Sequence, residues 1–312
     1  MDSITSLNLF KFCSGLLVLG YLAILLVIAI VAISYYAVVV VTCGPQLARG
    51  GVGSVLYSSI LVVFHFLLAL LLWSYFMVVF RDPGSVPENW RPVLEENLEL
   101  GISVALSDYV SSETSASTRN SSTGTERRQA LSYCSHCENF KPPRCYHCSI
   151  CKKCVLKMDH HCVWVVNCVG AQNYKFFLLF LLYTFMETTL DTLILMPHFI
   201  KFFEDAKNRS SSPSKHAITF LAFVLNLAFA LSLLCFLVMH ASLLSSNATT
   251  IEVNEKNRAA RWKFDVGRRK NFEQVFGAKK AYWFLPLLST EDLENIPALK
   301  GLDFPTCSDI EA

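Results

Sequence analysis

The chain has 312 residues, of which 53% are hydrophobic and only 17% are charged, and its formal net charge is +2. This composition is too apolar for an ordinary soluble globular protein, and the apolar residues are concentrated in blocks. A nucleic-acid partner is disfavoured because the basic residues lie beside those blocks and form no exposed basic platform. The distribution of charge along the chain is more informative than its sum.

Four apolar blocks are each long enough to cross a bilayer core of about 30 Å. Backbone groups cannot stay unsatisfied in lipid, so we expect each block to be a helix. The first block is roughly twice as long as the apolar region of a signal peptide and has no clear A-x-A cleavage site, which favours a retained transmembrane helix. The predicted spans are residues 12–41, 54–80, 174–200 and 217–245.

Lysine and arginine are unevenly divided among the segments outside the predicted helices. Residues 81–173 carry ten of them and residues 246–312 carry ten more, whereas residues 42–53 carry one and residues 201–215 carry four. The positive-inside rule therefore places the middle segment and the tail in the cytosol. With four spans, both termini are cytosolic as well.

Three segments outside the helices have a distinctive composition. Residues 108–128 are rich in Ser and Thr, which is typical of a flexible linker. The "RDPG" motif at residues 81–84 follows the second predicted span, where proline and glycine stop a helix. Residues 270–288 mix basic and aromatic residues and are too interrupted to span, so we expect them to lie against the membrane or the helix bundle.

Eight of the twelve cysteines lie between Cys134 and Cys168, in the segment predicted to be cytosolic. Disulfides are disfavoured in the cytosol, so the pattern C-x2-C-x9-H-C-x2-C-x2-C-x4-D-H-H-C-x5-C indicates zinc binding. Two closed four-ligand sites would leave some of the possible ligands for other roles. The same stretch also holds four histidines, His136, His147, His160 and His161.

The stretch "DHHC" at residues 159–162 offers side chains suited to nucleophilic catalysis. In an extended segment His160 and Cys162 share a face, while the adjacent His161 points the other way. His160 is then placed to act as a base for the Cys162 thiol, and Asp159 to fix the imidazole tautomer. Spacing alone leaves open whether Cys162 is a nucleophile or a further zinc ligand.

Two acidic residues interrupt the third predicted span. Glu187 and Asp191 are four residues apart and so share one helical face. Ionisable groups inside a membrane are costly and face the bundle interior or a polar cavity. Two interpretations stay open: the acids bond to polar side chains such as His65 or Asn226 and hold helices together, or Glu187 forms the floor of a cavity.

The order of these features resembles that of the DHHC-type protein S-acyltransferases. The cysteine pattern is followed by "TTIE" at residues 249–252, similar to the family's TTxE motif, and by "NFEQVFG" at residues 271–277, similar to its aromatic C-terminal motif. The "DPG" at residues 82–84 follows the second helix, as in the family. The likeness covers most of the chain, and Val163 resembles plant members.

The resemblance implies transfer of a fatty acyl group, usually palmitoyl, from acyl-CoA to cysteine thiols of target proteins. It implies a two-step reaction in which Cys162 is first acylated, with His160 as the base and Asp159 as the orienting residue. It leaves Cys145 without a role. It also implies two structural zinc ions, one held by Cys134, Cys137, His147 and Cys154, and the other by Cys148, Cys151, His161 and Cys168.

The expected fold is an all-α polytopic membrane protein with four transmembrane helices and a small cytosolic two-zinc cysteine-rich module. The expected location is the endomembrane system, meaning the Golgi, the endoplasmic reticulum or the plasma membrane. The expected partners are acyl-CoA and proteins with cysteines near the membrane. The predicted parts are the first two helices (1–80), a linker with DPG (81–133), the zinc module (134–173), the last two helices (174–245) and the tail (246–312).

Cations are needed for the CoA phosphates at the cytosolic face. Lys141, Arg144 and Lys175 are the candidates, with anchoring at the membrane interface as their alternative role. Two positions depart from the family's usual pattern: Val163 replaces a common proline and Val166 a common asparagine. Neither position supplies a catalytic or metal group, so the departures concern the geometry of the loop.

Two other classes of function compete with this interpretation. A membrane-tethered zinc module that binds proteins, such as a RING-like ubiquitin ligase adaptor, explains the zinc ligands but not the unused D-H-x-C set or the TTxE motif. A channel or transporter is disfavoured by the few intramembrane charges and the lack of a pore-like repeat. Hydroxylamine-sensitive acyl label on Cys162 separates the enzyme from both.

Overall fold

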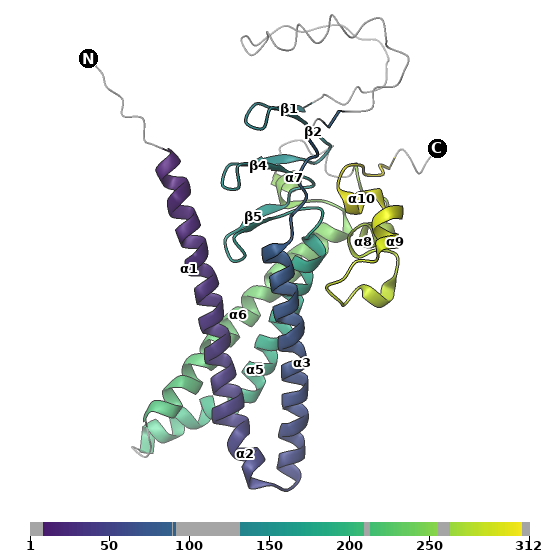
Figure 1. The fold of residues 1–312 in the computed structure, drawn as a ribbon. Coiled ribbons are helices and arrows are strands. Elements are labelled where there is room, and N and C mark those ends of the chain that lie inside the picture. The colour runs from purple at the N-terminus through teal and green to yellow at the C-terminus, as the bar shows by residue number, and fades with distance from the viewer. Residues whose placement is uncertain (1–8, 89, 92–131, 209–212, 255–262, 308–312) are drawn as a thin grey trace, which may run out of the picture.

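Four long helices form the body of the protein, and a module of short strands lies at one end of it (Figure 1). The computed structural model describes residues 9–88, 90–91, 132–208, 213–254 and 263–307, so the predicted linker 108–128 lies outside the described residues. The predicted four-helix membrane fold is confirmed, with short strands only in the cysteine-rich module among the described residues, because four helices are long and apolar enough to cross a membrane: Gly20–Arg49, Val52–Phe80, Tyr174–Glu204 and Ala217–Ser245.

The first helical run is longer than the sequence predicts, and it continues past residue 41 to Arg49. Most of the connection expected at residues 42–53 is helical, and the chain turns only at Gly50 and Gly51. These two residues have φ angles of 71° and 78°, in the left-handed region that glycine adopts without steric cost. The helical run consists of α1 (Leu9–Tyr35), a π-helical stretch η1 (Tyr36–Cys43) and α2 (Gly44–Arg49), and the chain returns as α3 (Val52–Phe80).

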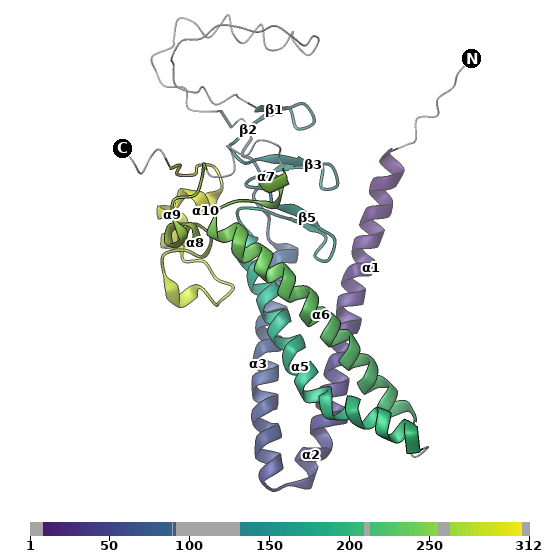
Figure 2. The same cartoon turned by 180° about the vertical axis from the view of Figure 1, so that it is seen from behind.

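Helices α5 (Tyr174–Asn208) and α6 (Pro213–Ser245) pack along each other, and α5 also packs against α3. Both helices extend into residues 201–215, which the sequence predicts to be a loop. Charged residues such as Lys and Glu have high helix propensity, so a helix can continue past the apolar part of a span. Pro213 is the first residue of α6, a position where its missing N–H costs no helical bond. In both views the end of α5, the start of α6 and α2 lie opposite the strands (Figure 2).

Three antiparallel hairpins build the cysteine-rich module within the described residues. Each hairpin is closed by a turn that contains a residue with positive φ, namely Glu138, Lys152 or Val166. The short strands bring ligands close together without a large core of their own. The hairpins are β1 (Ser132–Cys134) with β2 (Asn139–Lys141), β3 (Tyr146–Cys148) with β4 (Lys153–Val155), and β5 (His160–Cys162) with β6 (Asn167–Val169).

The segment after α3 attaches the module to the helix bundle. Leu156 N donates to Gly84 O at 2.9 Å, and Gln172 N donates to Pro83 O at 3.1 Å. The Asp82 carboxylate accepts a hydrogen bond from Gly84 N at 2.7 Å, which fixes the turn after the helix. The RDPG motif therefore ends α3 and also hydrogen-bonds to the backbone around the hairpins.

The tail folds against the ends of α5 and α6 nearest the strands. Phe272, Phe276 and Leu285 pack on the main core, so this part of the tail lies on the helix bundle, one of its two predicted positions. Asn271 is fully buried and donates to Ser245 O at 2.8 Å, at the end of α6. The tail contains α7 (Thr250–Asn254), α8 (Arg268–Phe276), η4 (Lys280–Tyr282), α9 (Thr290–Asn295) and α10 (Pro297–Lys300).

The main core lies where the β5–β6 hairpin meets α3 and α5. Val78, Val165 and Phe176 are fully buried there, and Cys162 belongs to the same cluster. Close packing of such side chains is what holds helices together in a membrane, where lipid is as apolar as the protein interior. The strand that carries "DHHC" thus packs against the helices.

Candidate active site

Strand register pairs the candidate zinc ligands across two hairpins. His147 lies opposite Cys154 in β3–β4, and His161 lies opposite Cys168 in β5–β6. A C-x-x-C turn from the preceding hairpin completes each group. The four ligand atoms of each group lie within 4.8 Å of one another, and the groups are Cys134, Cys137, His147 and Cys154, and Cys148, Cys151, His161 and Cys168.

Both groups fit a structural zinc ion. Tetrahedral Zn²⁺ with sulfur ligands at about 2.3 Å and nitrogen ligands at about 2.0 Å holds its ligand atoms about 3.5–3.8 Å apart. The Sγ atoms of the second group lie 3.8, 3.4 and 3.6 Å from His161 Nδ1, for Cys148, Cys151 and Cys168 respectively. Four protein ligands close each site, so neither group offers a free position for a substrate.

Cys145 packs beside the first group without belonging to it. It lies in a small buried cluster with Cys134 and Cys154. Burial raises the pKa of the Cys145 thiol to about 12, which keeps it neutral. Cys145 therefore behaves as a small core residue.

The turn of the third hairpin holds Val166 in an unusual conformation. Its φ of 51° lies in the left-handed region, which β-branched residues rarely adopt and asparagine tolerates. A side chain in place of Gly20 would come within 2.7 Å of a Val166 methyl group. The valine thus packs against the backbone of α1, and this contact joins the first helix to the turn.

The side chains of "DHHC" lie as an extended strand predicts. His161 contributes to the second zinc group, while His160 and Cys162 belong to the same strand two residues apart. The His160 ring donates from Nδ1 to Asp159 Oδ2 at 2.7 Å. Burial opposes a charge on His160, but the hydrogen bonds to Asp159 and Cys162 outweigh it and raise the pKa of His160 to about 9.

Asp159 is held by the TTIE motif as well as by His160. Thr250 donates to Asp159 twice, from its backbone N to Oδ1 at 3.1 Å and from its hydroxyl to Oδ2 at 2.7 Å. Burial opposes ionisation of Asp159, yet the hydrogen bonds from His160 and Thr250 hold the pKa of Asp159 below its usual range. The carboxylate is therefore ionised and fixed toward the imidazole.

The same motif forms a capping box at the start of α7. Thr249 N donates to Glu252 Oε2 at 2.9 Å, and Glu252 N donates to Thr249 Oγ1 at 3.3 Å. The cap leaves Thr250 free to reach Asp159. The spacing T-T-x-E thus couples a helix start to the catalytic candidates, a role that the motif's sequence does not reveal.

Arg144 is buried and forms internal contacts with the TTIE segment. Its guanidinium donates to both Glu252 oxygens, at 2.6 and 2.7 Å, and to the side chain and backbone of Asn247. The rings of Phe264 and Phe304 lie 4.5 and 5.0 Å from its guanidinium carbon. This arrangement joins the hairpins to the tail.

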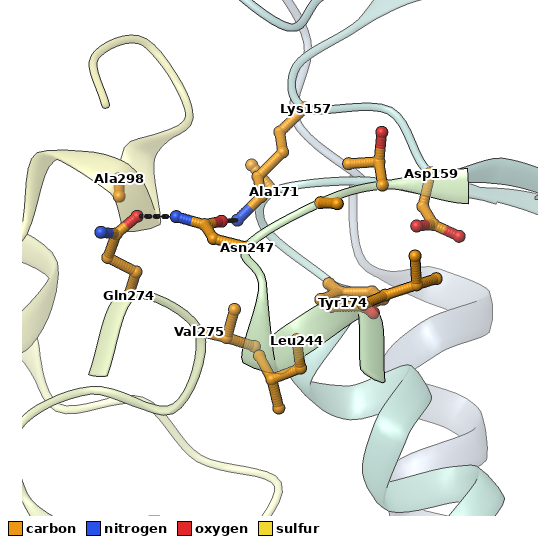
Figure 3. A pocket seen from close by; sticks show the side chains of 12 residues that line it. Lys157, Asp159, Ala171, Tyr174, Leu244, Asn247, Gln274, Val275 and Ala298 are labelled. Carbon is orange, nitrogen blue, oxygen red and sulfur yellow. Dashed lines mark hydrogen bonds between the residues drawn. The ribbon is translucent and has the colours of Figure 1, made fainter. Parts of the chain in front are cut away.

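Lys157 and Asn247 form a second connection between the module and the tail (Figure 3). Lys157 Nζ donates to Asn247 Oδ1 at 3.0 Å, and Asn247 Nδ2 donates to Gln274 Oε1 at 2.9 Å. Burial and the nearby Arg144 charge lower the pKa of Lys157 to about 7. Asp159 and Lys157 both line the small pocket in Figure 3, so this second connection lies next to the candidate site.

The three candidate CoA contacts occupy different settings. Lys141 is half-buried at the end of β2. Lys175 is buried, and its Nζ donates to the backbone oxygens of Tyr282 and Leu287 at 2.7 and 2.5 Å. The donors of Lys175 and Arg144 thus face partners inside the protein, a finding that offers no support for their predicted contact with CoA phosphates.

A cavity of about 440 Å³ opens beside Cys162 and extends among all four long helices. His160 and Cys162 line it at the strand end, and its middle is walled by apolar residues such as Leu71, Phe180 and Phe236. Such a cavity suits a long hydrocarbon chain whose reactive end lies at the thiol.

His240, which belongs to none of the sequence motifs, also faces this cavity next to His160. The two imidazole centroids are 6.2 Å apart, and Tyr174 Oη lies 3.1 Å from His240 Nδ1. A lone histidine in an apolar helix carries no spacing signal. The folded chain brings it beside His160, which lies 80 residues earlier in the sequence.

We expect Glu252→Gln to lower the free energy of unfolding by about 3–5 kcal/mol, because the change leaves the Arg144 charge buried without its carboxylate. Hydrogen bonds from Arg144 outweigh burial and hold the pKa of Glu252 below its usual range. The ionised Glu252 carboxylate therefore contributes its full share to the free energy of unfolding above pH about 4.3, the pKa of an unperturbed Glu. That contribution is lost as the pH falls through the lower pKa of Glu252 in the folded state. Thermal and denaturant unfolding measure both effects.

Glu291→Gln is the matched control, because Glu291 pairs with Lys279 at the surface at 2.6 Å. Exposed pairs contribute little, so no measurable change in unfolding is expected. Equal stability losses in the two variants would contradict the structural role of the buried pair.

Comparisons with known proteins agree with the geometry. The family model for DHHC palmitoyltransferase matches residues 127–257. "Probable protein S-acyltransferase 12" of Arabidopsis thaliana is 61% identical over 98% of this chain and 100% of its own length, and "Probable protein S-acyltransferase 14" is 54% identical over 98% and 96%. The human "Palmitoyltransferase ZDHHC2" is 32% identical over 93% of this chain and 76% of its own length.

Proposed function

The chain belongs to the DHHC palmitoyltransferase family, and from this we propose that it transfers a fatty acyl group such as palmitoyl from acyl-CoA to cysteine thiols of proteins at the membrane. The observation that carries the proposal is the position of Cys162. It shares a strand with His160, which is hydrogen-bonded to Asp159, and it lines the end of an apolar cavity among the helices.

In the first step His160 takes the proton of the Cys162 thiol, and the sulfur attacks the thioester carbonyl of acyl-CoA. A new S–C bond forms on Cys162, the S–C bond to CoA breaks, and the CoA thiolate takes the proton from the imidazolium. Asp159 keeps the imidazole in the tautomer whose Nε2 faces the thiol, because its carboxylate accepts the hydrogen of Nδ1.

In the second step the thiol of a target protein attacks the acyl-enzyme. His160 takes the proton of the incoming thiol and returns it to the Cys162 sulfur as the S–C bond breaks. The target cysteine must reach the strand end of the cavity, so substrates are proteins whose cysteines lie near the membrane surface. Lys141 stays a predicted contact for the CoA phosphates.

The apolar cavity supplies binding energy for the acyl chain. Each buried CH₂ is worth about 0.8 kcal/mol before entropic costs, so a long chain binds substantially better than a short one. The chain lies among the helices while its thioester stays at the thiol. This placement explains why a transferase that acts on surface thiols has four membrane-spanning helices.

We propose that the two groups of Cys and His residues hold zinc ions that are structural. Zinc bound there would cross-link the hairpins and hold β5 in place; it supplies no position for a reacting atom. The acyl-transfer steps are then carried out by Asp159, His160 and Cys162.

The test is incubation of the purified protein with labelled acyl-CoA, followed by peptide mapping. A thioester on Cys162 is cleaved by neutral hydroxylamine, so we expect label on the peptide that contains Cys162 and its loss after hydroxylamine. A zinc-saturated, folded protein that takes up no label would favour the protein-binding adaptor.

We propose that the strand module and tail face the cytosol in an endomembrane and that the far ends of α5 and α6 face the lumen. Among the Asn-x-Ser/Thr sequons, Asn208 then lies on the lumenal side, at the end of α5. Asn247 is buried in the contact with Lys157, and Asn120 lies outside the described residues.

For this orientation we expect a glycan on Asn208. Asn208→Gln should remove that glycan, and Asn120→Gln should leave it in place. The measurement is the electrophoretic shift produced by a glycosidase on protein from a eukaryotic host. A glycan at Asn120 would reverse the orientation.

A further inference from the structure

The cavity changes character along its length. Its reactive end holds Cys162 and its middle is apolar, but its deepest residues on three helices are polar. On α5 the lining runs from Phe177 beside His160 down to Asp191, because α5 begins at the strand end. The polar lining at the far end consists of Ser34 from α1, Glu187, Thr188 and Asp191 from α5, and Asn226 from α6.

Glu187 and Asp191 carry hydrogen-bonding capacity that the protein does not use. Their side chains are 5% and 1% exposed, and within the part of the chain that the structure describes, both oxygens of Glu187 and Oδ1 of Asp191 have no hydrogen-bond partner. The neighbouring Asn226 is engaged, since its Nδ2 donates to Ser34 Oγ and to a backbone oxygen. Such unpaired buried oxygens each cost about 1–3 kcal/mol unless something binds them.

The depth of the two carboxyl groups along α5, counted from Phe177 beside His160, matches the length of a common acyl chain. Glu187 and Asp191 follow Phe177 by ten and fourteen residues, which is about 15 and 21 Å along a helix that rises 1.5 Å per residue. An extended hydrocarbon advances about 1.3 Å per carbon, since its bonds of about 1.5 Å zigzag. The end of a chain of roughly 12 to 16 carbons therefore reaches the two carboxyl groups.

We propose that the far end of the cavity is a hydrogen-bonding subsite for a polar group at the end of the acyl chain, so that the enzyme accepts ω-hydroxyacyl-CoA in preference to the unsubstituted acyl-CoA of the same length. A carboxyl group keeps an acceptor oxygen whether or not it is protonated, so either form accepts from the hydroxyl. The inference rests on the proposed function, because it assigns the acyl donor to this cavity.

The reaction at the thiol is the same for both donors. The Cys162 sulfur forms a bond to the acyl carbonyl carbon, the bond from that carbon to the CoA sulfur breaks, and the proton passes through His160 to CoA. The terminal hydroxyl stays intact at the far end. It replaces bonds to water with a bond to Glu187 or Asp191, whereas a terminal methyl group leaves those oxygens unpaired.

The experiment is a competition between hexadecanoyl-CoA and 16-hydroxyhexadecanoyl-CoA at equal concentration, with the purified parent protein. Intact-protein mass spectrometry resolves the two acyl-enzymes because they differ by one oxygen atom. We expect the parent to favour the hydroxyacyl adduct on the order of tenfold, the ratio that about 1.4 kcal/mol produces. Glu187→Leu with Asp191→Leu should lose the preference, and Glu187→Gln, which keeps an acceptor oxygen, should retain it.

Thr189→Val is the matched control. Thr189 lies on the same helix, and its Oγ1 is also buried without a hydrogen-bond partner among the described residues. Thr189 does not line the cavity. We expect it to keep the preference of the parent. Equal loading of the two donors by the parent, or a preference that survives the double leucine change, overturns the subsite. Failure of both donors to load the parent would instead contradict the proposed function.

Discussion

Cys162→Ser is expected to lower acyl-enzyme formation at least a thousandfold while both zinc groups stay filled. A serine hydroxyl is a far weaker nucleophile than a thiol at neutral pH, and His160 cannot compensate for that difference. The two zinc groups draw on eight other residues, and Cys162 is in neither of them. Fluorescent acyl label and metal analysis on the same preparation measure the two expectations together.

Cys145→Ser is the control for this change. Cys145 is buried in the same module, lies outside both zinc groups and has no contact with the apolar cavity among the described residues. Its variant should keep label and zinc near the level of the parent. A Cys162→Ser protein that lost about half of its zinc would identify Cys162 as a ligand and remove the basis for the nucleophile.

Periodicity and composition predicted the helices well, because an apolar block in lipid has few alternatives to a helix. The sequence did not predict where the first connection lies. Thr42 and Cys43 read as the start of a polar loop, yet both are buried inside a helical run that ends only at Gly50. Hydropathy marks the end of an apolar stretch, whereas a helix ends where a residue such as glycine changes the backbone conformation.

The candidate site shows a different limit. The sequence predicted that His160 and His161 point in opposite directions, because consecutive side chains in a strand lie on opposite faces. The internal roles of Arg144 and Lys175 were not readable, because a basic residue near a membrane helix looks the same in sequence whether it faces phosphate or a buried carbonyl. Arg144 donates to Glu252, 108 residues later, and a contact over that separation leaves no signal in sequence spacing.

Cys168→Ala and Cys134→Ala are each expected to lower bound zinc from about two ions to about one per chain, with different effects on acylation. Structural zinc binding in small modules is coupled to folding and contributes about 10–16 kcal/mol, far more than two short strands supply. Cys168 lies opposite His161 in the hairpin that carries Cys162, so loss of its zinc group releases the reactive strand. We expect Cys168→Ala to lose acylation almost completely.

Cys134 belongs to the first hairpin, whose zinc group contains no residue of β5 or β6. Cys134→Ala should therefore keep more acylation than Cys168→Ala at the same zinc content. Metal analysis measures bound zinc, limited proteolysis measures folding of the module, and acyl label measures acylation. The control is Cys145→Ala, which removes a buried thiol from the same cluster and should retain both ions. Full zinc occupancy in Cys134→Ala or Cys168→Ala would refute the division of ligands, because each variant removes one of the four atoms that close a tetrahedral site.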